Sequence, residues 1–178
     1  MQEAAWPAQR EAQRTAALLL NNAYPVNTLD VSDPQSDPAY SNEVHPANKP
    51  KVGNRMAFRA LHEVYGRDGD VWASPRITGA EFTDNGEVIL HVSQSGDGLT
   101  TKDGEPPRGF FLAGPDQHWH PATAVLNGDT IGLYSDEVPH PVAIRYAWAN
   151  NPAHNVVNSL RLPLGSWRSD DWQLRTDG

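Results

Sequence analysis

The chain has 178 residues, 38% of them apolar and 20% charged, which suits one globular domain of ordinary size or two small units. Its formal net charge is −8, from 14 basic and 22 acidic residues, and this excess of acid argues against a nucleic-acid partner. The absence of cysteine excludes disulfides and thiolate metal sites. No stretch approaches the roughly 18 apolar residues of a membrane span, and the first residues lack the basic and apolar regions of a signal peptide.

The beginning of the chain predicts a helix, a strand and a long loop. Residues 3–20 are rich in Ala, Gln, Glu and Arg and carry an apolar face, a pattern typical of an amphipathic helix. Residues 26–31 read Val-Asn-Thr-Leu-Asp-Val and predict a short strand. Residues 32–41 are dominated by Ser, Asp and Pro, which predicts a loop rich in turns.

Residues 42–55 form the stretch around which we expect the rest of the chain to be organised. His45 lies in a polar loop, with Glu43 two residues before it and Pro46 stiffening the chain just after it. Because imidazole titrates near neutral pH, His45 is a candidate general base. The alternative interpretation is a loop histidine that caps a helix or faces solvent.

A second helix is predicted directly after this loop. Asn48 is a suitable N-cap, and Gly66 suits the left-handed residue that follows a helix C-terminus. Apolar side chains at steps of four predict its buried face: Val52, Met56, Ala60 and Val64.

Beyond Gly66 the helical spacing gives way to short alternating runs separated by turns that contain Gly and Asn. The predicted strands are residues 76–82, 87–92, 109–113, 120–126, 130–134 and 142–148. Regular short strands of this kind favour a β-sandwich or jelly roll. We therefore expect a boundary near residues 66–72, between an incomplete α/β unit over residues 1–66 and a β-sandwich over residues 67–178.

Five separated segments carry a resemblance to a known family. They are Trp6 with Arg10-Glu11-Ala12-Gln13; residues 26–31; Glu43-Val44-His45-Pro46 with Asn48-Lys49, Val52-Gly53 and Arg55; residues 141–150; and Leu162-Pro163 with residues 167–172. In this order and spacing, they resemble the C-terminal part of the sialate O-acetylesterase family, a branch of the SGNH hydrolases. The resemblance implies the C-terminal end of a three-layer α/β/α domain, followed by a jelly-roll-like β-sandwich.

The resemblance also implies a chemistry, the hydrolysis of O-acetyl esters of sialic acid or related sugars by a serine nucleophile and a histidine base. In that family the serine lies far upstream in a GQSN-type segment, and this sequence contains neither that segment nor the family's oxyanion-hole segments. The implied catalytic residues are His45 as the base and Glu43, which either orients His45 or is a solvated loop acid. The implied partners are an O-acetylated sugar and the missing N-terminal half of the hydrolase domain. No cofactor or metal is implied, and the family is often exported.

A non-catalytic β-sandwich module that binds glycan or supports a partner chain is the alternative function. A metal site at His118 and His120, which would share one face of a strand, is remote because no third ligand is evident nearby. Arg145, Tyr146 and Trp148 either border a sugar site or belong to the core.

Overall fold

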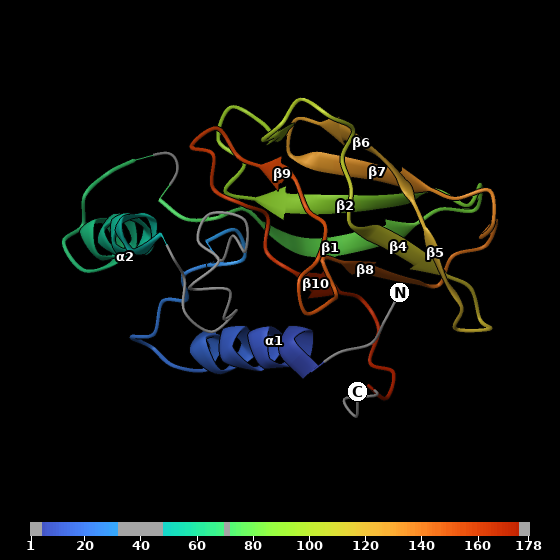
Figure 1. Cartoon of the computed structure of the whole chain (residues 1–178), viewed down its shortest axis with the longest axis horizontal. Coiled ribbons are helices and arrows are strands. Elements are labelled where there is room, and N and C mark those ends of the chain that lie inside the picture. The colour runs from blue at the N-terminus through green and yellow to red at the C-terminus, as the bar shows by residue number, and fades with distance from the viewer. Residues whose placement is uncertain (1–4, 32–47, 70–71, 175–178) are drawn as a thin grey trace.

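The structure is a computed structural model that describes residues 5–31, 48–69 and 72–174. Within these residues two helices precede a set of strands that all pair antiparallel (Figure 1). The helices are α1 (Ala5–Leu18) and α2 (Lys49–Glu63), and neither is long and apolar enough to cross a membrane. The strands are β1 (Arg76–Phe82), β2 (Val88–Ser93), β3 (Thr100–Thr101), β4 (Phe110–Ala113), β5 (Trp119–Pro121), β6 (Thr123–Asn127), β7 (Thr130–Tyr134), β8 (Ala143–Tyr146), β9 (Val156–Val157) and β10 (Trp167–Arg168).

The strands form two four-stranded sheets that enclose one apolar core. Their orders are β1-β2-β7-β6 and β10-β8-β4-β5, and β3 and β9 pair separately. On β2, the side chains of Val88, Leu90 and Val92 are buried and alternate with partly exposed ones. These three residues share a single cluster with Leu112 of β4 and Ile144 of β8, from the other sheet. The prediction of a β-rich, sandwich-type unit is confirmed.

The strand predictions hold where the alternation is long enough to see. The predicted runs 76–82 and 130–134 coincide with β1 and β7. The predicted run 120–126 is instead two strands, because the chain leaves the β4–β5 pairing at Pro121 and joins β7 in the other sheet from Thr123 onward. Three short strands, β3, β9 and β10, were not predicted, since two residues are too few to display a period.

The predicted strand at residues 26–31 is wrong. Residues 23–28 have no regular secondary structure, and they pair with no strand in the part of the chain that the structure describes. The Asn27 side-chain oxygen accepts a hydrogen bond from the Leu29 N–H at 3.0 Å, and the Val31 N–H donates to the Thr28 carbonyl at 3.3 Å. A strand needs a neighbouring strand to satisfy its backbone hydrogen bonds. Here local hydrogen bonds, to a side chain and within a turn, satisfy some of these groups instead.

The second helix has the predicted ends but not the predicted buried face. The Asn48 side chain accepts a hydrogen bond from the Lys51 N–H at 3.0 Å, and Gly66 has φ of +64° after the helix. Met56 and Val64 are 58% and 64% exposed, and Arg55 is the one buried residue of the helix. The helix therefore turns its arginine side inward and leaves apolar side chains open.

Polar contacts join the helices to the sandwich. The Arg10 guanidinium donates to the Ala149 carbonyl at 2.7 Å and to the Ala147 carbonyl at 3.2 Å. Glu11 forms an ion pair with Arg168 at 2.9 Å. The division of the chain near residues 66–72 stays a prediction, and these contacts cross it.

A buried ion pair joins β8, an inner strand of the second sheet, to the segment after β10. Arg145 of β8 and Asp170 have side chains that are 0% and 1% exposed. Two hydrogen bonds join them, Nε to Oδ2 at 2.9 Å and Nη2 to Oδ1 at 2.7 Å, and the guanidinium lies 4.4 Å from the centre of the Trp119 ring. Since Tyr146 and Trp148 are also buried, these residues belong to the core and do not border an open sugar site.

We expect Asp170→Asn to lower the free energy of unfolding by about 3–5 kcal/mol, because it leaves the buried Arg145 charge without its partner. Urea denaturation followed by tryptophan fluorescence measures this change. The exposed neighbour provides the control, and Asp171→Asn should change the same free energy by less than about 0.5 kcal/mol. Equal effects of the two variants would contradict the assignment.

Candidate functional site

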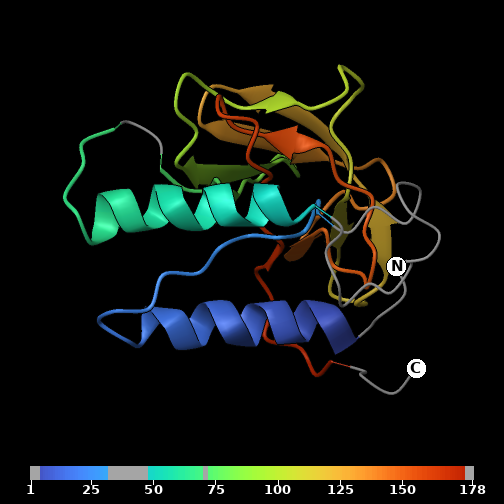
Figure 2. The ribbon, with the colours of Figure 1, turned by 60° about the vertical axis from the view of Figure 1, so that its left-hand side comes forward.

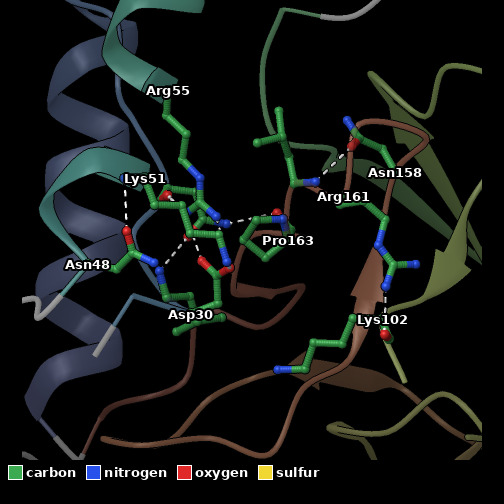
Figure 3. Close-up of polar contacts among 11 residues, drawn as sticks. Asp30, Asn48, Lys51, Arg55, Lys102, Asn158, Arg161 and Pro163 are labelled. Carbon is green, nitrogen blue, oxygen red and sulfur yellow. Dashed lines mark hydrogen bonds and ion pairs between the residues drawn. The ribbon is translucent and has the colours of Figure 1, made fainter. Parts of the chain in front are cut away.

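The polar cluster nearest in sequence to the candidate catalytic loop is built around Asp30. Lys51 and Arg55 lie four residues apart on α2, so both side chains project from one face of the helix. Lys51 Nζ lies 2.7 Å from Asp30 Oδ2, and the two terminal nitrogens of Arg55 lie 2.6 and 2.8 Å from the two carboxylate oxygens (Figure 3). Arg55 also donates to the Asn27 carbonyl at 2.7 Å. Asp30 is thus held by two cations of one helix.

The environment of Asp30 favours its charged form. Burial alone would raise the pKa of the carboxyl group, but the hydrogen bonds and charges of Arg55 and Lys51 outweigh burial and lower the pKa from 3.8 to about 2. Asp30 is therefore ionised at neutral pH, and this charge balances the buried Arg55 guanidinium.

His45 and Glu43, the candidate catalytic residues, lie outside the described residues, as does Pro46. The structure describes the chain on both sides of them. Val31 is 3% exposed on one side, and on the other Asn48 caps α2. Because Asp30 binds Lys51 and Arg55, the chain before the loop and the helix after it are joined directly. The roles of His45 and Glu43 stay predictions.

A groove of about 460 Å³ lies between α1, residues 20–28, the C-terminal part of α2 and the first residues of the β unit. In Figure 2 the two helices lie one above the other, with the chain that follows α1 running between them. The lining of the groove includes two aromatic residues, four arginines and one carboxylate: Tyr24, Trp72, Arg10, Arg14, Arg59, Arg76 and Glu63. No sequence pattern predicts this groove, because its walls come from segments far apart in the chain.

Trp72 fixes one wall of the groove. Its ring stacks on His62 of α2 with centroids 3.6 Å apart and 19° between the planes. Its indole N–H donates to Glu63 at 3.1 Å, and its backbone N–H donates to the Gln94 side chain at 3.3 Å. The end of α2 is thereby attached to the sandwich.

The two histidines considered for metal binding pair with different acids. His118 lies 3.2 Å from Asp116, and His120 lies 3.2 Å from Glu137. The His118 side chain is 79% exposed. No group of three or more His, Asp or Glu side chains suited to a metal gathers in the described part of the chain.

Comparison with solved structures found matches, and one of them is similar over almost the whole chain. No family profile and no curated protein matches the sequence. The crystal structure of XAC1771, described as a novel carbohydrate acetylesterase from Xanthomonas citri, matches with a TM-score of 0.84 and 36% identity over 95% of this chain. This chain spans 37% of that protein. The likeness supports the predicted relation to carbohydrate esterases.

We expect the Asp30 cluster to make stability depend on pH. A carboxyl group with a folded-state pKa of about 2, against an ordinary value of 3.8, stabilises the fold above about pH 4, and this stabilisation is lost as the pH falls toward 2. Asp30→Asn should therefore lower the free energy of unfolding at pH 6 by on the order of 2 kcal/mol, whereas near pH 2 the variant and the parent should converge. Urea denaturation at both pH values measures the difference.

The matched control for this experiment is Asp68→Asn, which changes an exposed acid outside the cluster. It should follow the parent at both pH values. A constant difference between the Asp30 variant and the parent from pH 6 to pH 2 would show that the charge of Asp30 is not what stabilises this region.

Proposed function

We propose that this chain is part of a carbohydrate esterase that removes O-acetyl groups from sialic acid or a related sugar by a Ser/His mechanism. The observation that carries the proposal is the likeness to the Xanthomonas carbohydrate acetylesterase, at 36% identity over 95% of the chain. The substrate class follows from that protein's description together with the sialate O-acetylesterase motifs of the sequence.

The contacts among the motif segments support the proposal. Arg10 and Glu11, from the first segment, bind the carbonyl of Ala149 and the side chain of Arg168, which belong to the last two segments. Arg55, from the segment that contains His45, binds the carbonyl of Asn27 in the second segment. Motif segments that are far apart in the sequence are thus in direct contact, as expected if they belong to one fold.

In the proposed mechanism, His45 takes the proton of a serine hydroxyl as that oxygen attacks the acetyl carbonyl. Glu43 accepts a hydrogen bond from the other ring nitrogen and holds the imidazole in the required tautomer. The serine and the oxyanion-hole donors come from another part of the hydrolase, since no GQSN-type segment occurs in these 178 residues.

The same proposal assigns residues 1–66 to the C-terminal end of an SGNH-type α/β/α domain. Residues 23–28 have no strand partner within the described ranges, and Arg59 and Arg55 donate to the carbonyls of Pro25 and Asn27. The proposal places this segment beside the sheet of that domain. Ligands bind at the carboxyl ends of strands in such sheets. A loop that follows residue 31 would therefore begin at the active-site edge.

A non-catalytic glycan-binding or supporting module is the second candidate. The observation that favours it is the sandwich itself, which has a continuous buried core drawn from both sheets. Under this alternative the chain would bind a sugar or a partner chain without contributing to hydrolysis.

We expect the isolated chain to hydrolyse neither an aryl acetate nor an O-acetylated sialic acid above background. Removing the nucleophile and the oxyanion donors of such a site lowers the rate by many orders of magnitude. The measurement is the initial rate with each ester after size-exclusion chromatography. Turnover that co-purifies with the chain and is abolished by a serine-directed phosphonate would show that the chain has a nucleophile of its own.

In an enzyme reconstituted with the remaining part of a close relative, His45→Ala should lower the rate of deacetylation about a thousandfold or more. Glu43→Gln should lower it about tenfold to a hundredfold, because the amide still accepts a hydrogen bond but lacks the charge. The comparison uses kcat for an O-acetylated sialic acid.

His118→Ala is the control for the reconstituted enzyme, since that side chain is exposed on the sandwich and pairs only with Asp116 among the described residues. It should retain full activity. If His45→Ala also retains full activity while the supplied serine is essential, the base is another residue.

A further inference from the structure

Lys102 is an exposed cation without an acidic partner, in a chain whose formal net charge is −8. Its ammonium group makes no hydrogen bond or ion pair with the residues that the structure describes. The acid next to it, Asp103, accepts a hydrogen bond from the Asn155 side chain at 3.0 Å and pairs with Arg108. Because Asp103 is engaged elsewhere, the Lys102 ammonium is available to an anion from outside the chain.

The backbone of Lys102 is held in place by a buried asparagine. Asn155 is 0% exposed, and its backbone carbonyl accepts a hydrogen bond from the Lys102 N–H at 2.8 Å. Its side-chain amide donates to the Pro106 carbonyl at 3.0 Å and accepts from the Arg108 N–H at 3.0 Å. A buried amide is costly to leave unpaired, so these bonds fix residues 102–108 as one loop and give the Lys102 side chain a defined origin.

A second cation lies against the same loop. The Arg161 guanidinium is exposed, donates to the Lys102 carbonyl at 2.6 Å, and meets no carboxylate in the described part of the chain. Arg161 has φ of +61°, and its N–H donates to the Asn158 carbonyl at 2.9 Å. This tight turn presses the guanidinium against the loop. Two neighbouring cations without acids attract an anion more strongly than either would alone.

Both cations lie on the side of the sandwich that meets Asp30. Two residues after Arg161, the Pro163 carbonyl accepts a hydrogen bond at 3.0 Å from the side chain of Asn27, which precedes Asp30 by three residues. In Figure 3 the Lys102 side chain points away from the Arg161 guanidinium and toward the side of the view on which Asp30 lies. Lys102 therefore faces the region from which the candidate catalytic loop begins.

His154 senses the charges on both sides of this region. Its side chain is 9% exposed, and Nδ1 donates to the Pro152 carbonyl at 3.0 Å. Burial lowers the pKa of His154, the Pro152 carbonyl raises it in part, and Lys102, Asp30 and Arg108 then lower, raise and lower it. Because charges act on one imidazole only from nearby, Lys102 and Asp30 flank the same place.

An acidic sugar would supply the charge that the two cations lack. Sialic acid carries a carboxylate in addition to its O-acetyl esters, whereas a neutral sugar would leave both cations without an anion. We propose that Lys102, with Arg161 beside it, binds the carboxylate of an acidic sugar and makes the enzyme prefer acidic over neutral acetylated sugars. This inference rests on the proposed function for the reaction, and it assigns the choice of substrate to a loop of the β-sandwich.

The first test measures binding to the full chain alone. Titration with N-acetylneuraminic acid, followed by amide NMR spectra, should shift the signals of residues 100–108 and 158–163, and the affinity should fall as salt rises. Lys102→Gln should raise Kd about threefold to tenfold, because it removes one exposed cation from the carboxylate. Lys102→Arg keeps the charge and should restore most of the affinity. N-acetylmannosamine, which has no carboxylate, should shift none of these signals.

Two controls define the binding. Arg67→Gln removes an exposed arginine that lies beyond the end of α2, and it should leave Kd unchanged. Acetate tests the ligand: if it binds at the same residues as tightly as N-acetylneuraminic acid does, the loop attracts carboxylates in general and the recognition of a sugar is overturned. An equal loss of affinity with Lys102→Gln and Lys102→Arg would overturn the role of charge.

The second test uses the reconstituted enzyme and separates this inference from the proposed function. Lys102→Gln should lower the ratio of kcat/KM for an O-acetylated sialic acid to that for a neutral O-acetylated hexosamine about threefold to tenfold, through KM. Binding at Lys102 without hydrolysis of any acetyl ester would support the subsite and overturn the esterase assignment. Hydrolysis with an unchanged ratio would support the esterase and overturn the role of Lys102. Absence of NMR shifts at residues 100–108 would overturn the subsite whether or not the ester is hydrolysed.

Discussion

The ion pair between Arg145 and Asp170 is the constraint on which much of the structure depends. A fully buried guanidinium is stable only beside a compensating charge, and Asp170 supplies it from the segment after the last strand. That segment must therefore run along β8, where the Ser169 N–H donates to the Ile144 carbonyl and the Ser169 hydroxyl accepts from the Ile144 N–H. One buried charge in the middle of a sheet thereby fixes the course of the end of the chain. The same course brings Arg168 to the surface that faces α1.

The position of the first helix follows from that arrangement. Arg168 pairs with Glu11 at 2.9 Å, and Arg10, one residue earlier on α1, donates to the carbonyl of Ala149. Apolar burial contributes little here, because Pro7 is the one buried residue of α1. The second helix also buries little apolar surface. Its one buried residue is Arg55, which pairs with Asp30. Directional charge pairs therefore orient both helices, and apolar side chains such as Met56 stay exposed.

The sequence predicted those elements whose pattern is decided by their own residues. The strand β7 buries alternate residues, so its alternation is visible, and the cap at Asn48 and the turn at Gly66 follow from local backbone geometry. Residues 26–31 were misjudged because a strand exists only if a neighbour pairs with it, and composition does not report the neighbour. The face of α2 was misjudged for a related reason: amphipathic spacing predicts which side is apolar, not whether anything covers it. The arginine groove, assembled from remote segments, left no local pattern at all.

The candidate base shows how the parts combine. His45 and Glu43 stay predictions, but the chain that carries them begins beside Asp30 and ends at the N-cap of α2, and these two places are joined by the Lys51 and Arg55 contacts. The carboxylate that does this is ionised well below neutral pH, so the joint persists over the range in which an imidazole titrates. Under the proposed mechanism, a proton taken up by His45 leaves these contacts unchanged, because they involve only Asp30, Lys51 and Arg55.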